Sequence, residues 1–270
     1  MNLQLGMPTL LEAKPPEACA VLCKELGLDF VELNMNLPEY QVESIHVSRL
    51  MNIAARYGIY FTIHLDENLN PCDFNERVAW AHVETVIRAI EIAKLINAPI
   101  LNMHLAEGVY FTLPDHRVYL FDEYEAIYLR KLKTFRDACA NAITDANITI
   151  CVENTNGYRR AAFLLKGLDL LLESPAFALT FDIGHNAGAD HVDEALILDR
   201  FLKLSHFHIH DAKGKRNHLP LGEGELDLNR YLRMAGELDC RAVLETKTAE
   251  GLRRSVEWMR DTPWKSGELR

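Results

Sequence analysis

The stretch LSHFHIHD, residues 204–211, runs directly into AKGKRNHLPLGEG, residues 212–224. Within this apolar strand pattern a histidine stands at every second position, as His206, His208 and His210. Alternate side chains of a β-strand point to the same face, so the three imidazoles share one face of the predicted strand. The stretch therefore predicts a strand that carries imidazoles toward its end and then gives way to a loop containing cations and glycines.

Short β-branched or aromatic runs like this one alternate with longer helical patterns along the whole chain. The predicted strands are LQLGM (3–7), FVELNMN (30–36), IYFTIHL (59–65), PILNMHL (99–105), ITICVEN (148–154), FALTFDI (177–183), LSHFHIHD (204–211) and RAVLETK (241–247). The predicted helices cover residues 16–26, 42–57, 75–96, 121–146, 162–173, 193–202, 228–238 and 249–260. These βα units, without a linker or a low-complexity break, favour one (β/α)8 TIM-barrel domain over residues 1–270, with its active site at the C-terminal mouth. An open doubly wound sheet is the alternative.

Composition and charge narrow the classes of protein to which the chain can belong. Hydrophobic residues make up 49% and charged residues 25%, which is typical of a globular protein with ample core material. The formal net charge of −10 argues against a large nucleic-acid interface, because such interfaces depend on neutralising phosphates with Lys and Arg. The sequence contains no GxGxxG, GxxxxGK(S/T) or GxSxG motif, so nucleotide binding and serine hydrolysis lack their usual signatures.

Two further features concern the compartment. No apolar run approaches the roughly 20 residues that span a bilayer, and the opening MNLQLGMPTLLEAKPP lacks a basic segment followed by an apolar one. The six cysteines show no CxxC spacing, and most of them sit in apolar periodic segments, which predicts buried reduced thiols. We therefore expect a cytoplasmic protein with no membrane-bound part.

Polar side chains stand near the carboxyl ends of the predicted strands, where the strands of a barrel converge. They are Glu32, His64, His104, Glu153, Asp182, His208 and Glu245. A single histidine at such a place is most often a hydrogen-bonded core residue, but a whole set of buried acids and imidazoles is costly unless its members have partners. A divalent cation neutralises and coordinates them together, so the set predicts a metal site. Two roles stay open for Glu32: a group that supports the site or meets the substrate, and a salt bridge at the rim.

The chain resembles a known superfamily in several of these motifs. They are VENTNG (152–157), TFDIGH (180–185), HFHIHDAKG (206–214), HLPLGEG (218–224) and VLETK (243–247). Together they resemble the xylose-isomerase-like TIM barrels, a superfamily of sugar isomerases and epimerases that also contains the endonuclease IV group (AP endonuclease family 2). The similarity covers nearly the whole chain, and its motifs are more specific for the superfamily than for a reaction.

The resemblance implies specific metal ligands. The four-ligand site of the isomerases and epimerases corresponds here to Glu153, Asp182, His208 and Glu245. His64 and His104 match ligands of a further zinc in endonuclease IV, with Glu153 as the bridging carboxylate, and His185 and His218 match ligands of its third zinc. The remaining ligand of the third zinc is an aspartate in that group, and Arg216 stands in its place. A guanidinium cannot ligate a cation, and the glycine-rich opening that helps that group grip DNA is also missing.

Three functions remain open on this basis. The first is a sugar or sugar-phosphate isomerase or epimerase, in which Glu153 and Glu245 pass protons to and from the substrate and His185 bonds a substrate oxygen. The second is an endonuclease IV-like phosphodiesterase with a two- or three-metal centre, and the third is a sugar or metal binder without activity. The acidic balance and Arg216 favour the first. Zn, Mn, Mg, Fe and Co all suit the mixed ligand set, in one site or two.

Cations gather in the loops on the predicted mouth side. They are Arg159 and Arg160 after the fifth predicted strand, Lys213, Lys215 and Arg216 after the seventh, and Lys247 after the eighth. In an acidic chain this gathering indicates an anionic carbohydrate, such as a sugar phosphate, while the alternative is that the cations only balance the acids of the site. Members of the superfamily often associate, so the resemblance also implies a homo-oligomer.

Overall fold

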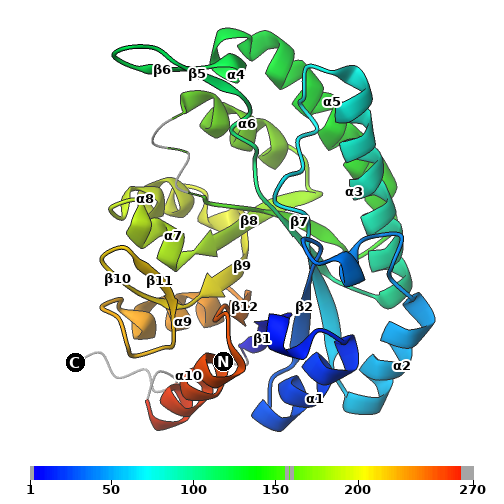
Figure 1. The fold of residues 1–270 in the computed structure, drawn as a ribbon, viewed down its shortest axis with the longest axis vertical. Helices are drawn as coiled ribbons and strands as arrows, with labels where there is room; N and C mark the ends of the chain where they lie inside the picture. Colours follow the sequence, from blue (N-terminus) through cyan, green and yellow to red (C-terminus); the bar gives the residue numbers. More distant parts are fainter. Residues whose placement is uncertain (1–2, 156–157, 159–160, 263–270) are drawn as a thin grey trace.

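The computed structural model describes residues 3–155, 158 and 161–262, and its centre is a closed barrel of eight parallel strands (Figure 1). The strands are β1 (Gln4–Pro8), β2 (Phe30–Asn34), β3 (Tyr60–His64), β4 (Ile100–Met103), β7 (Thr149–Glu153), β8 (Phe177–Asp182), β9 (Leu204–Ile209) and β12 (Arg241–Leu244). β1 pairs in parallel with both β2 and β12, which closes the sheet. The predicted TIM barrel is therefore confirmed, and the open doubly wound sheet is wrong.

Helices surround this barrel, as Figure 1 shows. The α-helices are α1 (Pro16–Leu26), α2 (Val47–Tyr57), α3 (Glu76–Ile96), α4 (Leu120–Glu123), α5 (Glu125–Ile143), α6 (Ala162–Leu172), α7 (Ile183–Gly188), α8 (Val192–Leu198), α9 (Leu228–Glu237) and α10 (Ala249–Asp261). Short 3-10 turns are η1 (Leu11–Ala13), η2 (Pro38–Tyr40) and η3 (Phe201–Lys203). Gly27 and Gly58 end α1 and α2 in the left-handed conformation, with φ of 75° and 64°, which glycine adopts without strain.

The elements differ from the sequence prediction in a few places. The helix expected from residue 42 begins at Val47, and the helix expected over residues 121–146 is broken at Tyr124 and ends at Ile143. Two short hairpins and α7 were not predicted. The hairpins are β5 (Tyr110–Thr112) with β6 (Arg117–Tyr119), and β10 (Asp211–Lys213) with β11 (Arg216–Leu219). α7 has six residues, fewer than two helical turns, and the hairpin strands of three or four residues lie within loops, without the longer apolar run that marks each barrel strand.

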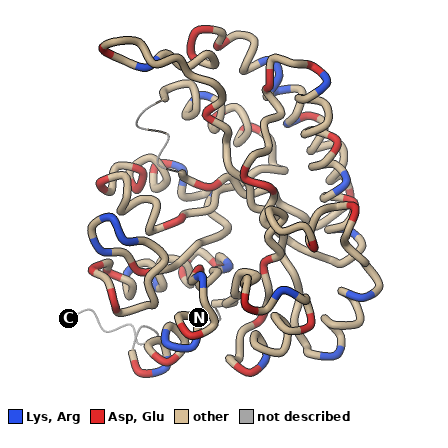
Figure 2. The backbone as a smooth tube through the Cα atoms, viewed as in Figure 1, with Lys and Arg blue, Asp and Glu red and all other residues tan. Residues whose placement is uncertain are grey.

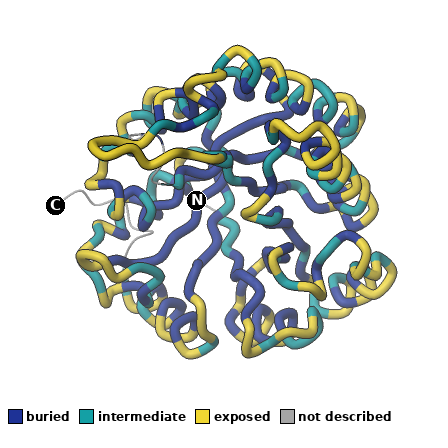
Figure 3. Tube along the Cα trace, turned by 45° about the horizontal axis from the view of Figure 1, so that its top comes forward, coloured by how far each residue is buried: buried dark blue, intermediate teal, exposed yellow. Residues whose placement is uncertain are grey.

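The barrel strands are largely buried, whereas the exposed residues lie on the surrounding helices and loops. Figure 3 shows buried strands converging at the centre, with exposure concentrated on the outer faces of the helices and along the β5–β6 hairpin. The six cysteines are free and buried, as the sequence predicted. Among the described residues, no helix is long and apolar enough to cross a membrane. The buried interior also contains polar side chains, which lie at the carboxyl ends of the strands.

Candidate metal centre at the barrel mouth

His208, near the end of β9, lies in the middle of three carboxylates. Its Nδ1 atom is 3.3 Å from Glu153 Oε2, 3.5 Å from Glu245 Oε2 and 3.8 Å from Asp182 Oδ2. Glu153 ends β7, Asp182 ends β8 and Glu245 follows β12, so four different segments supply the group. The structure thus brings together the four residues that the sequence predicted as a metal site.

The donor atoms of this group fit a cation. Asp182, His208 and Glu245 each offer one ligand atom within 4.8 Å of the others. His208 Nδ1 and Glu245 Oε2 are buried and have no hydrogen-bond partner, an arrangement that costs free energy unless something else satisfies these atoms. Carboxylate oxygens together with one imidazole nitrogen suit a divalent metal ion. Their role as ligands stays a prediction.

A second group of histidines surrounds Glu153. His104 Nε2 lies 3.1 Å and His64 Nε2 3.5 Å from its Oε2 atom, while His185 Nδ1 lies 3.3 Å from its Oε1 atom. Asn102, on β4, also donates a hydrogen bond to Oε2. The carboxylate of Glu153 therefore contacts His208 of the first group as well as the histidines of the second, as a carboxylate that bridges two metal ions would.

The remaining predicted ligand, His218, lies on β11 beside Glu245. Its Nδ1 atom is 3.2 Å from the backbone oxygen of Glu245 and 3.8 Å from its Oε2 atom. His210 lies on the other side of Asp182, with Nε2 3.2 Å from the carboxylate. The sequence placed His210 on the imidazole face but did not assign it to the site, although its position two residues after His208 was the available signal.

The acids and imidazoles of the mouth shift one another's pKa values and so favour each other's charged forms. Burial opposes ionisation of Glu153, but the imidazoles of His208 and His104 outweigh it and keep its pKa well below the usual range. Burial likewise lowers the pKa of His64, and the hydrogen bond to Glu153 and its charge overcome this and raise it to about 9. For His185 the charge of Asp182 and the contact with Glu153 overcome burial and raise the pKa to about 10. Without a metal ion, the acids of the mouth are thus neutralised by protonated imidazoles.

The chain is similar to known proteins in both sequence and fold. Residues 20–262 match the family described as xylose isomerase-like TIM barrel. The chain belongs to this family. The resemblance that the motifs indicated is therefore confirmed.

Relatives and solved structures agree with this membership. An uncharacterized protein of Methanocaldococcus jannaschii, MJ1614, is 23% identical over 197 residues, which are 72% of this chain and 73% of that protein. The crystal structure of a D-tagatose 3-epimerase-like protein has a TM-score of 0.77 and 23% identity, and covers 96% of both chains. The 3-keto-D-glucoside 4-epimerase YcjR from E. coli has a TM-score of 0.71 and 16% identity, over 97% of this chain and 100% of that chain. At these identities the likeness shows the shared barrel fold.

Glu32 takes an unexpected place in this xylose isomerase-like barrel. Its side chain is 2% exposed, and its Oε1 atom lies 3.0 Å from His208 Nε2, on the side of the imidazole away from the other carboxylates. The sequence left open a salt bridge at the rim of the mouth, and that alternative is wrong, because Glu32 lies inside the barrel. Because it lies behind the imidazole, away from the point where Glu153, Asp182 and Glu245 meet, a role in supporting the site is favoured over contact with a substrate.

The predicted rim cations occupy different surroundings. Lys247 Nζ donates to Glu245 Oε1 over 2.7 Å, so it pairs with an acid of the site. Lys213, Lys215 and Arg216 lie exposed around the turn of the β10–β11 hairpin, where Figure 2 shows a run of basic residues. Arg159 and Arg160 lie outside the described residues. An anion-binding role of these cations stays a prediction.

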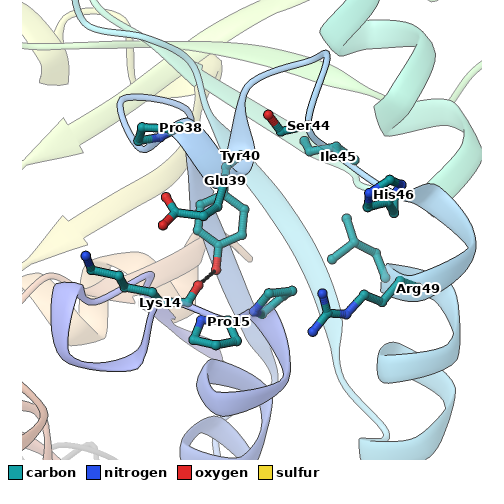
Figure 4. A pocket seen from close by; sticks show the side chains of 11 residues that line it. Lys14, Pro15, Pro38, Glu39, Tyr40, Ser44, Ile45, His46 and Arg49 are labelled. Carbon is teal, nitrogen blue, oxygen red and sulfur yellow. Dashed lines mark hydrogen bonds between the residues drawn. The ribbon is translucent and has the colours of Figure 1, made fainter.

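A separate pocket lies away from these residues. It has a volume of about 560 Å³ and sits between the starts of α1 and α2, lined in part by Lys14, Pro15, Tyr40 and Arg49 (Figure 4). Tyr40 Oη donates to the backbone oxygen of Lys14 and ties its two sides together. No residue of the two candidate metal-ligand groups lines this pocket, so it is not the space in which they would act.

Proposed function

We propose that the protein is a divalent-metal-dependent isomerase or epimerase of a sugar or sugar phosphate. The observation that carries the proposal is that Glu153 and Glu245, from different strands of the barrel, bring their carboxylates to one point, 3.3 Å and 3.5 Å from the Nδ1 atom of His208. In the barrel their strands β7 and β12 are separated by β8 and β9. Two carboxylates that flank one point are suited to removing a proton from one face of a carbon and returning one to the other.

The residues of the mouth would hold the metal ion and transfer the proton. Glu153, Asp182, His208 and Glu245 would hold the ion. A bound divalent ion supplies Lewis-acid polarisation of a carbonyl and its neighbouring hydroxyl, which makes the adjacent C–H more acidic. Glu153 or Glu245 then takes the proton from that carbon, and the other carboxylate or the same one returns it.

Neighbouring side chains keep these carboxylates in place. His185 donates from Nδ1 to the backbone oxygen of Asn154 over 2.9 Å, which leaves its Nε2 atom free to bond a substrate oxygen. Lys247 holds one oxygen of Glu245, and Asn102 holds one oxygen of Glu153. Solved structures with the same fold support the substrate class, since they include a D-tagatose 3-epimerase-like protein, a D-psicose 3-epimerase and a 3-keto-D-glucoside 4-epimerase.

A second candidate function rests on the other group of histidines. His64 and His104 point their Nε2 atoms at Glu153 Oε2, over 3.5 Å and 3.1 Å, so two ions could share Glu153. A two-metal centre is suited to hydrolysis of a phosphodiester. Arg216, in place of the aspartate expected for a third zinc, and the net charge of −10 count against this alternative.

One experiment separates the two functions. The metal-loaded protein is incubated in D₂O with a panel of ketoses and aldoses, free and phosphorylated, and in parallel with an oligonucleotide containing an abasic site. An isomerase or epimerase gives a new sugar with solvent deuterium at the carbon beside the carbonyl. Cleavage of the oligonucleotide without any change in the sugars contradicts the proposal.

The variant His104→Ala sharpens the distinction. A one-metal isomerase keeps its ion at Glu153, Asp182, His208 and Glu245 and retains turnover, whereas a two-metal hydrolase loses nearly all activity. Glu153→Gln serves as the inactive reference, since it removes a carboxylate needed in both schemes. The metal content of each purified variant is measured alongside.

A further inference from the structure

A second tier of polar side chains lies one step deeper in the barrel than the predicted metal ligands. It consists of four residues, each of which precedes a residue of the mouth by two positions. They are Thr62 before His64, Asn102 before His104, Thr180 before Asp182 and His206 before His208. All four are fully buried. Because side chains two apart share a face, the same alternation that brings the mouth residues together also stacks this tier beneath them.

A hydrogen bond at one point and an ion pair at another connect the tier to the mouth. On one side, Thr180 Oγ1 donates to Asn102 Oδ1, and Asn102 donates to Glu153. On the other side, Thr62 Oγ1 donates over 3.3 Å to Glu32 Oε2, and Glu32 Oε1 lies 3.0 Å from His208 Nε2. Both ends of the tier therefore reach a residue of the predicted metal site.

Glu32 is a buried carboxylate at the level of this tier, since it pairs in register with Thr62. Among the described residues it forms ion pairs with His206 and His208, and with no Lys or Arg. Burying a carboxylate costs several kcal/mol of free energy unless nearby charges and hydrogen bonds compensate, and here the charge of His208 is the main compensation. An apolar side chain would fill the same space without this cost, so a purely space-filling role does not account for a glutamate here.

The contact with Glu32 determines which nitrogen of His208 is free. Nε2 faces the Glu32 carboxylate, so the proton belongs on Nε2, although the carboxylate lies off the ideal line of the ring N–H. Nδ1 then carries the lone pair, and it is the atom that faces Glu153, Asp182 and Glu245. A carboxylate behind a metal-binding histidine fixes its tautomer and ring orientation and raises its basicity as a ligand.

We propose that Glu32 is a positioning residue that holds His208 in the Nε2–H form and aims Nδ1 at the three carboxylates of the mouth. The inference rests on the proposed metal centre. Glu32 acts through His208 and does not touch the substrate. Thr62 in turn orients Glu32 through the hydrogen bond to its second oxygen.

Metal affinity tests this role separately from activity. Wild type, Glu32→Gln and Glu32→Leu are stripped of metal and titrated with Zn²⁺ against a chromophoric chelator. Loss of such a supporting carboxylate weakens metal binding by about 10- to 100-fold, so we expect Glu32→Leu in that range. Glu32→Gln retains an oxygen that can accept the Nε2–H bond and is expected to fall between Glu32→Leu and wild type.

Ser255→Ala is the matched control for a general loss of stability. Ser255 is fully buried on α10, accepts a hydrogen bond from Leu221 N over 3.0 Å and donates to Gly251 O, and neither partner is a residue of the predicted metal site. We expect this variant to lose stability and to keep the Zn²⁺ affinity of wild type. If Glu32→Leu is folded and binds Zn²⁺ as tightly as wild type, the inference is overturned while the metal centre stands.

A spectroscopic measurement keeps the inference testable even if Glu32→Leu does not fold. The ¹⁵N chemical shifts of His208 in the Zn²⁺-loaded wild type report which nitrogen carries the proton. The expected result is a protonated Nε2 and a metal-bound Nδ1, and the opposite assignment overturns the inference. Wild type that binds no Zn²⁺ at all overturns the metal centre itself, an outcome distinct from a failure of Glu32 alone.

Discussion

Asn102 donates a hydrogen bond from its side-chain amide to Oε2 of Glu153, deep inside the barrel. Replacing Asn102 with Asp removes this donor and sets a second carboxylate against the first. At about pH 8 both would be ionised, and we expect the free energy of unfolding of the metal-free protein to fall by about 2–4 kcal/mol. The loss should be smaller at about pH 5, because two carboxylates in contact raise one pKa and share a proton.

Asn102→Leu is the control for this prediction. It removes the same donor from Glu153 without adding a charge, so its loss of stability should be similar at the two pH values. Urea denaturation of both variants and wild type measures the difference. A pH-independent loss for Asn102→Asp would show that repulsion between the carboxylates is not the cause.

The imidazoles of the mouth predict how stability depends on pH in the metal-free protein. His64 and His185, with pKa values of about 9 and about 10 against an ordinary 6.5, bind protons in the folded state that the unfolded state releases above 6.5. Their contribution is complete below 6.5 and is lost as the pH rises through 9 and 10, at about 1.4 kcal/mol per pH unit for each proton. Stability should therefore fall steadily on the alkaline side.

Two other histidines determine how the stability of the metal-free protein changes with pH below 6.5. Burial lowers the pKa of His206 to about 3 and that of His218 to about 4, so the unfolded state binds protons below 6.5 that the folded state does not. Stability should thus rise with pH between these values and 6.5, which puts its maximum near 6.5. Urea denaturation across this range in the presence of a chelator measures the curve. Stability that is flat or rising between 6.5 and 9 would contradict the assignment.

The loop after β9 is organised by one acid. Asp211 is buried, and its carboxylate accepts hydrogen bonds from the backbone N–H groups of Ala212, Gly222, Gly224 and Leu226, over 2.8 to 3.1 Å. In Asp211→Asn one oxygen becomes an NH₂ donor that faces two of these donors. We expect a loss of about 2–4 kcal/mol and faster hydrogen exchange at Gly222 and Gly224.

Asp227→Asn is the matched control for the loop. Asp227 caps α9, where its side chain accepts from Arg230 N over 3.1 Å, and asparagine is an equally good capping residue. This variant should change stability little. Unchanged exchange at Gly222 and Gly224 in Asp211→Asn would show that the loop is held by other contacts.

The tier beneath the mouth shows how far the sequence predicted the site. The mouth residues were predictable because each stands at the end of a strand whose alternation is clear. The deeper tier follows from the same alternation, since Glu32 pairs in register with Thr62 and Thr180 with His206. Yet Thr62, Asn102 and Thr180 are ordinary polar residues, and only the tilt and stagger of the closed barrel show that their side chains meet.

The hairpin was unpredictable for a different reason. Asp211, at the start of β10, holds the segment that follows β11 through backbone groups up to fifteen positions later, and no periodicity in the sequence reports such contacts. The sequence indicated only that the loop contains cations and turn-forming glycines. Its three exposed cations, Lys213, Lys215 and Arg216, are placed by this fold on the turn of the hairpin.

These cations give the last prediction, which concerns the substrate. Arg216 lies two residues before His218 on β11, and His218 contacts Glu245 of the predicted site. If the substrate carries a phosphate that reaches the hairpin, Lys213→Gln/Arg216→Gln should raise KM for the phosphorylated sugar about 10-fold or more and leave KM for the free sugar unchanged. The effect should weaken in high salt, because exposed charges are screened.

Lys133→Gln is the control for a mere change in net charge. Lys133 lies exposed on α5 and pairs with Asp137, one helical turn away. Steady-state kinetics with matched free and phosphorylated sugars measure all variants. Equal KM changes for both sugars, or none for either, would mean that the hairpin cations only balance the acids of the mouth and that the substrate is recognised without them.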